Sequence, residues 1–212
     1  MKMSKVLVAV AGLVSIVVTA GCSSQPSAAS ASECEKVQKW VQANAKRLPH
    51  SYSELTEYPT AYRRAIYATY SPDERSAVWQ GHFDAYLMQH PELGQEQVDY
   101  LRRAKELATP AFFANAKLKE SRAQLESLRT GLETLFGSDE AFNILAQLGP
   151  SDDSLISTLY GGGGGGGNCS CSLSSDWCGG SSHCASGGCT NVEDECGTLW
   201  TYLCNGNCHP NT

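Results

Sequence analysis

Eight of the ten cysteines of this 212-residue chain fall within its last 45 residues. Such a density indicates either a set of disulfides or a metal cluster. The spacing is a CxC step followed by gaps of six, five, four, six, seven and three residues, through Cys169, Cys171, Cys178, Cys184, Cys189, Cys196, Cys204 and Cys208. Zinc sites usually contain CxxC pairs, which this spacing lacks, although His183 and His209 each adjoin a cysteine and would be available to a metal. We expect four disulfides, and the sequence leaves their pairing open.

The first 22 residues favour disulfides over metal, because they direct the protein out of the cytoplasm. Lys2 and Lys5 precede an uncharged apolar run of 14 residues, Val6–Thr19, which is typical of a signal peptide and short for a transmembrane helix. The run leads into VTAGC, which resembles a bacterial lipobox, with Thr19 where that pattern more often has Leu. The resemblance implies cleavage by signal peptidase before Cys22, lipidation of Cys22 and anchoring on the outer face of a bacterial membrane. The alternative is an ordinary secretory signal with Cys22 as a further half-cystine, and both routes lead to an oxidising environment.

Seven consecutive glycines separate the cysteine-rich tail from the rest of the chain, namely Gly161, Gly162, Gly163, Gly164, Gly165, Gly166 and Gly167. A phosphate-binding loop usually carries a Lys and leads into a helix, whereas no Lys or Arg follows this run. Because glycine has the most backbone freedom to lose on ordering, we expect a hinge that is also open to proteases. The predicted organisation is a signal peptide with lipobox (1–22), a flexible tether (23–32), a helical domain (33–160), a polyglycine linker (161–167) and a cysteine-rich domain (168–212).

The segment between tether and glycines has the hydrophobic periodicity of helices and no strand alternation, so we predict an all-α helical body of five to six helices. Its clearest helix start is Ser71-Pro72-Asp73-Glu74, where Ser71 can cap the helix and Glu74 can complete a capping box. The leucines of 110–136 fall near a seven-residue repeat, which fits a short coiled coil with a partner or one helix packed on its neighbours; the short length favours the second. The expected helices are 33–47, 60–70, 71–90, 95–108, 110–136 and 138–148.

Composition and motifs argue against an enzyme and against a nucleic-acid-binding protein. The formal net charge is -6, and all sixteen Lys and Arg precede the glycine run, so no basic face for a nucleic acid is indicated. The body contains no HExxH, GxSxG or GxxxxGK[ST] motif, and His50, His82 and His90 lie on separate segments. We therefore predict no catalytic residue, no cofactor and no resident metal.

The tail itself is too small to bury much apolar surface, so we expect its shape to depend on crosslinks. The segment LWTYL, residues 199–203, alternates at the period of a strand, and Asn205-Gly206 is a hairpin-turn pair. The predicted tail is thus a small disulfide-rich mini-domain of loops with a β-hairpin near the C-terminus.

The sequence NCSCSLSSDWC…CGTLWTYLCNGNC, from Asn168 onward, resembles that of the fulvocin C-related bacteriocins. The shared features are the NCSCS opening, the Ser-Asp-aromatic-Cys step, Cys-Gly-Thr followed by Trp, and the CNGN close. The helical segment YPTAYRRAIYATYSPDERSAVWQGHFDAYL also resembles the helical part of this family. The resemblance implies a precursor or carrier of a bacteriocin-like peptide.

Three functions are consistent with these features. The first is an exported lipoprotein that carries a disulfide-rich bacteriocin, which is released by cleavage in the glycine run and acts on a component or receptor of the target-cell envelope. Because the tail has no Lys or Arg and a formal charge of -4, its contacts with a target would fall to Trp177, Trp200 and Tyr202. The second is a permanently anchored surface protein whose tail is a binding module without killing activity. The third is an extracytoplasmic metal-binding protein.

Overall fold

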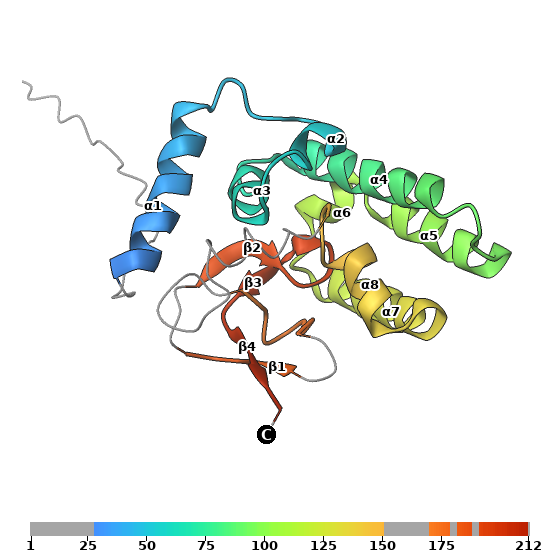
Figure 1. The fold of residues 1–212 in the computed structure, drawn as a ribbon. Coiled ribbons are helices and arrows are strands. Elements are labelled where there is room, and N and C mark those ends of the chain that lie inside the picture. Colours follow the sequence, from blue (N-terminus) through green and yellow to red (C-terminus); the bar gives the residue numbers. More distant parts are fainter. Residues whose placement is uncertain (1–27, 151–169, 179–181, 188–190, 212) are drawn as a thin grey trace, which may run out of the picture.

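The computed structural model of this chain describes residues 28–150, 170–178, 182–187 and 191–211. The predicted signal peptide, the lipidation site Cys22, the glycine run and two of the tail cysteines, Cys169 and Cys189, lie outside these residues. Two parts of the described chain are visible in Figure 1: a group of helices, and a smaller cysteine-rich region of short strands beside them.

The described residues contain eight helices, which confirms the helical body. Two of them, α2 and α6, span only four and five residues and account for the excess over the five to six helices predicted. The helices are α1 (Ala28–Ala43), α2 (Tyr52–Leu55), α3 (Thr60–Tyr67), α4 (Pro72–Gln89), α5 (Gln95–Leu107), α6 (Pro110–Ala114), α7 (Lys119–Phe136) and α8 (Ser138–Leu145).

Local chemistry explains where the central helix begins. The hydroxyl of Ser71 accepts a hydrogen bond from the backbone N–H of Glu74 at 3.3 Å, and the Glu74 carboxylate accepts one from the N–H of Ser71 at 2.7 Å. This is the predicted capping box, with Pro72 at the first helical position, where its missing N–H has no helical acceptor to lose. The same device at Ser51 and Glu54 begins α2, which the sequence reasoning did not find.

Several predicted boundaries are wrong: the helices expected at 33–47, 60–70 and 138–148 end three or four residues earlier, at Ala43, Tyr67 and Leu145, and two further differences are larger. Helix α1 begins at Ala28, so the last five residues of the expected tether are helical. The long segment 110–136 is two helices rather than one: α6 ends at Ala114, the side-chain amide of the next residue, Asn115, donates to the carbonyl of Ala111, and α7 begins at Lys119. A side chain that bonds the backbone of its own last turn competes with continuation of a helix, which accounts for this break.

The helices share one apolar core. Helix α4 contacts α2, α5 and α6, and α7 contacts α5 and α8. The leucines at 125, 128 and 132 of α7 are buried in this core, so the leucine repeat packs on neighbours within the chain, as we predicted.

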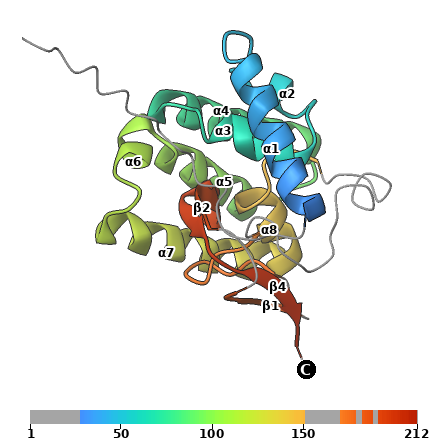
Figure 2. The same ribbon diagram turned by 90° about the vertical axis from the view of Figure 1, so that its left-hand side faces the viewer.

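The described part of the cysteine-rich region contains two antiparallel pairs of strands, which confirms the predicted mini-domain, but the hairpin is formed by other residues than expected. Strand β1 (Ser182–Ala185) pairs with β4 (Asn207–Pro210), and β2 (Val192–Cys196) pairs with β3 (Tyr202–Cys204). The predicted hairpin turn at Asn205-Gly206 instead joins strands of different sheets, and Thr198–Trp200 forms a 3₁₀ turn, η1. Both views show the β1–β4 ribbon projecting away from the helices, whereas β2 lies against them (Figures 1 and 2).

Candidate functional site

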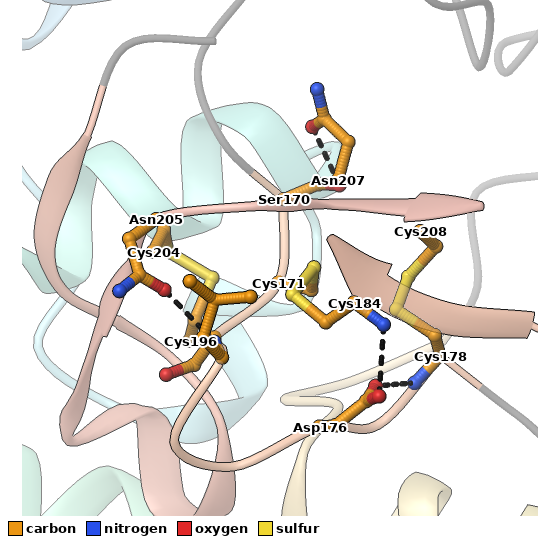
Figure 3. The surroundings of a disulfide bond; sticks show 12 residues. Ser170, Cys171, Asp176, Cys178, Cys184, Cys196, Cys204, Asn205, Asn207 and Cys208 are labelled. Carbon is orange, nitrogen blue, oxygen red and sulfur yellow. Dashed lines mark hydrogen bonds between the residues drawn. A yellow bond between two sulfur atoms is a disulfide. The ribbon is translucent and has the colours of Figure 1, made fainter. Parts of the chain in front are cut away.

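Three disulfides hold the described part of the tail, which confirms its disulfide-rich character. All of them join two tail cysteines, and among the described residues none links the tail to the helical body; the pairs are Cys171–Cys184, Cys178–Cys208 and Cys196–Cys204. The first two pairs lie side by side at the base of the β1–β4 ribbon (Figure 3). The tail therefore keeps these crosslinks whether or not it stays joined to the body.

The side chains between the cysteines fix the loops that the disulfides connect. The Asp176 carboxylate accepts hydrogen bonds from the backbone N–H groups of Cys178, at 2.9 Å, and Cys184, at 2.8 Å (Figure 3). The Asn205 side-chain oxygen accepts from the N–H of Leu173 at 2.8 Å. Gly206 has no room for a side chain, since a Cβ there would lie 2.7 Å from the Cys184 sulfur. The motif residues Asp176, Asn205 and Gly206 thus have structural reasons for their identity.

The 3₁₀ turn η1 has an unusual backbone. Gly197, Leu199 and Trp200 have φ angles of 68°, 54° and 49°, in the left-handed region that side chains other than glycine rarely adopt. A Cβ on Gly197 would lie 2.7 Å from atoms of Ser175 and Tyr202, so this position also excludes a side chain. Such a conformation persists only where surrounding contacts determine it. Ser175 and Trp177 of the tail are hydrogen-bonded to Thr198 of this turn, and Tyr67 of the helical body donates to the carbonyl of Leu199.

Trp200 occupies a slot in the core of the helical body and is only 1% exposed. Its ring stands perpendicular to those of Tyr67 and Trp79, at centroid distances of 5.3 and 6.3 Å. Its indole N–H donates to the carbonyl of Ala146 at 2.8 Å, just after α8. The hydroxyl of Tyr67 donates to the carbonyl of Leu199 at 3.3 Å. The polar edge of the indole is therefore satisfied, and Leu199, Trp200 and Tyr202 belong to the same core as the helices.

Three arginines of the body surround this contact. Arg122 of α7 stacks on the ring of Tyr202 at 3.7 Å and donates to both the hydroxyl and the carbonyl oxygen of Thr201, at 3.2 and 2.8 Å. Arg129 lies over the ring of Trp177 at 4.4 Å. Each of these contacts pairs a cation of the body with the face of an aromatic ring in the tail.

The third arginine, Arg64 of α3, lies 5.5 Å from the Trp200 ring and donates to the carbonyl of Ser170. Burial lowers the pKa of Arg64, while the Glu195 carboxylate of the tail opposes that change. A buried cation facing an acidic segment is favourable only while the two remain together, so the interface is complementary in charge as well as in shape.

The three predicted target contacts are thus engaged by the body in the intact chain. Trp200 and Tyr202 are 1% and 5% exposed, and Trp177 is partly buried against Phe142 and Arg129. In this state Trp200 and Tyr202 are not accessible to a target. Sequence reasoning missed the contributions of Arg64, Arg122 and Arg129, because nothing in their spacing relates them to the tail.

All six described cysteines of the tail are bonded in disulfides, so none of them offers a thiolate to a metal. The sulfurs of Cys171, Cys178 and Cys208 lie within 4.8 Å of one another, but all three are bonded in disulfides. His183 and His209 are opposite each other in the β1–β4 ribbon with ring centroids 6.4 Å apart, and the His183 ring is hydrogen-bonded to Asn211. His183 and His209 therefore form a cross-strand pair on the β1–β4 ribbon.

A cavity of about 730 Å³ lies where the body and the tail meet. Arg64, Arg129 and Phe142 line it from the body, and Trp177 and Cys208 line it from the tail. Because both parts form its walls, this cavity exists only while the tail is docked.

Comparison with known protein families, with characterised proteins and with solved structures finds no match for this chain. None of the described helices combines the length and the apolar character needed to cross a lipid bilayer. The interface between body and tail is the candidate site that the chain's own contacts define.

Proposed function

We propose that this chain is an exported lipoprotein precursor that carries a fulvocin C-like bacteriocin peptide and releases it by cleavage in the glycine run. The observation that carries the proposal is that every described disulfide lies within the tail. Disulfides stabilise a fold by reducing the conformational freedom of the unfolded segment that they close. A tail separated from the body keeps its disulfides, which a small unit with few apolar residues needs in order to stay folded.

Cleavage also removes a difficulty of the lipid anchor. A lipidated Cys22 would hold the peptide on the cell that made it, whereas a cut at Gly161–Gly167 frees the peptide and leaves the anchor behind. The tail carries no Lys or Arg, so recognition of an envelope component or receptor explains targeting better than general attraction to anionic lipids.

The second candidate function is a permanently anchored surface protein whose tail binds a partner without killing. The observation that favours it is the burial of Trp200 and Tyr202, because of which the body and the tail share one apolar core in the intact chain. In that case the surface available for binding is the exposed side of the tail, with Leu173, Leu203 and the β1–β4 ribbon.

Intact-mass spectrometry of the supernatant and membrane fractions of a producing strain separates the two. The precursor function predicts a supernatant peptide that begins near Asn168 and is lighter than its reduced mass by eight hydrogens, corresponding to four disulfides. The purified peptide is then assayed for killing of related cells. Full-length protein in the membrane with no peptide in the supernatant would rule out release and favour the anchored binding module.

The variant Cys22→Ser is the matched control for the anchor. Without the thiol that accepts lipid, the protein should lose the mass that the lipid adds, while any peptide that is released keeps the same mass. A lipid mass that persists in the variant would show that Cys22 is not the lipidated residue.

A further inference from the structure

The contact between the tail and the body has the features of a binding site and its occupant. Trp200 fills a slot whose walls are Tyr67, Trp79 and the carbonyl of Ala146, and its only polar atom is hydrogen-bonded there. A buried aromatic anchor with a satisfied N–H, surrounded by less buried contacts, is the arrangement that dominates affinity in protein interfaces. The occupant is therefore the segment 197–202 of the tail, and the receptor is the body.

Both partners lose contacts if they separate. Leu199 and Trp200 are buried by the body, and Tyr67 and Trp79 lie against the indole ring at 0% exposure. Separation would bring apolar surface of both parts into water, which opposes dissociation in proportion to the area exposed. Cutting the peptide bond in the linker changes none of these contacts.

Charge gives a second and independent reason for the pair to stay together. The tail has four acidic residues and no Lys or Arg, and the body presents Arg64, Arg122 and Arg129 to its rings and carbonyls. The two hydrogen bonds from Arg122 to Thr201 have a charged donor, and such bonds are stronger than neutral ones.

We infer that the helical body is a binding protein for its own tail: after a cut in the glycine run it retains the peptide, and a body left on the membrane rebinds free peptide through the Trp200 slot. The inference rests on the proposed function insofar as the peptide is cut from the chain in the cell. It assigns the body a role in shielding the producer, because a bound peptide has Trp200 and Tyr202 covered.

The test uses the full mature chain, with the seven glycines replaced by a seven-residue sequence for a site-specific protease. After complete cleavage, shown on a denaturing non-reducing gel, the sample is passed over a size-exclusion column at about 1 μM, a concentration at which an interface of modest affinity would dissociate. Co-elution of body and peptide is expected, and separate elution would overturn the inference.

Rebinding is tested by mixing the cut protein with an isotope-labelled cut sample and recording native mass spectra until the signals are constant. Hybrids of labelled peptide with unlabelled body are expected. If no hybrid forms under conditions in which the diluted complex dissociates measurably, the inference that the body rebinds free peptide is wrong.

Arg122→Ala removes a contact at the rim of the interface, away from the centre of the core. It should raise the dissociation constant of the cut complex about 10- to 100-fold, the range for loss of hydrogen bonds from a charged group. Arg103→Ala is the matched control, since Arg103 stacks in the same way on Tyr100 within the body, at 4.2 Å. An equal effect of the two substitutions would contradict the assignment of the interface.

These outcomes are separable from the fate of the proposed function. A cut complex that holds together in vitro, with no free peptide from a producing strain, would remove the precursor function and leave the affinity established. A cut complex that falls apart, together with active peptide in the supernatant, would remove only the inference.

Discussion

The helical body and the cysteine-rich tail are stabilised in different ways, yet they share one core. The body is held by apolar side chains on helix faces, and the described tail by disulfides and by side-chain bonds to its loops, such as those of Asp176. The largest apolar side chains of the tail are not used to stabilise the tail alone. Leu199, Trp200 and Tyr202 are inserted into the body instead.

This difference divides the tail into two functional parts. The β1–β4 ribbon carries one cysteine of each of two disulfides, Cys184 and Cys208, whereas η1 and β3 place Trp200 and Tyr202 in the core of the helices. A peptide whose fold is closed by disulfides but whose aromatic face is covered by a partner can be stored safely and still be intact when freed. The predictions below test whether the two parts are separable in this way.

The largest effect is expected from Trp200→Ala, which empties the slot in the body. Loss of a buried Trp should lower the free energy of unfolding of the intact oxidised chain by about 3 to 5 kcal/mol. Denaturant unfolding followed by circular dichroism of the helices measures it. The control is Trp177→Ala, since Trp177 is only partly buried; if both variants lose equal stability, the slot is not the centre of the interface.

Removal of the Cys178–Cys208 disulfide should act on the ribbon and leave the slot intact. With a sequence separation of 30 residues, the loop-closure model predicts a loss of about 3.5 kcal/mol for the double substitution Cys178→Ser and Cys208→Ser. Hydrogen exchange should show faster exchange at the ribbon amides, with the indole N–H of Trp200 still protected.

The Cys196–Cys204 disulfide closes a loop with a separation of only eight residues and spans β2 and β3, which lead into η1. Its removal should lower stability by about 2.5 kcal/mol in the same model and should expose Trp200. If the two double variants expose Trp200 to the same degree, the division of the tail into two parts is wrong.

A pH-dependent effect is expected from His82, which is in contact with Trp79. Its Nε2–H donates to the carbonyl of Ile144, and because burial keeps the ring neutral, Nδ1 accepts from the hydroxyl of Tyr52. Burial lowers the pKa of His82 to about 4. Between pH 6.5 and 4 the unfolded chain binds a proton that the folded chain does not, so stability falls by about 3 kcal/mol as the pH drops through this window and is fully present above it.

Urea unfolding at several pH values, with the oxidised chain, measures this dependence. His82→Gln should weaken the dependence of the free energy of unfolding on pH between pH 4.5 and 6.5. His209→Gln, at an exposed position of β4, should leave that dependence unchanged. A slope that is unchanged in the His82 variant would contradict a neutral buried ring.

Local chemistry made part of this structure predictable from sequence. The capping box at Ser71 and Glu74 depends on residues three apart, and the break at Gly137 depends on one glycine with φ of 78°. The gap at 115–118 was missed because it depends on one amide, that of Asn115, which turns back to its own helix.

The docking of the tail could not be read from any local pattern. Trp200 meets Tyr67 and Trp79 across more than a hundred residues and the glycine run, and helical periodicity does not encode such a contact. A signal was present all the same: Leu199, Trp200 and Tyr202 gather in a segment of an otherwise polar tail, which is more apolar surface than so small a unit can bury alone. That surface required a partner, and the partner is the rest of the chain.

The smallest effect on stability is expected on the opposite face of β3, where it separates the two candidate functions. Tyr202 is 5% exposed and faces Arg122, whereas the next residue, Leu203, is 38% exposed. Leu203→Ser and Leu173→Ser should change the free energy of unfolding by less than about 0.5 kcal/mol, as exposed positions usually do. A released peptide that acts through its uncovered aromatic face should lose activity in Tyr202→Ala and keep it in Leu203→Ser. An anchored binding module can use only the face that the body leaves free, so partner binding measured on intact cells would show the reverse order.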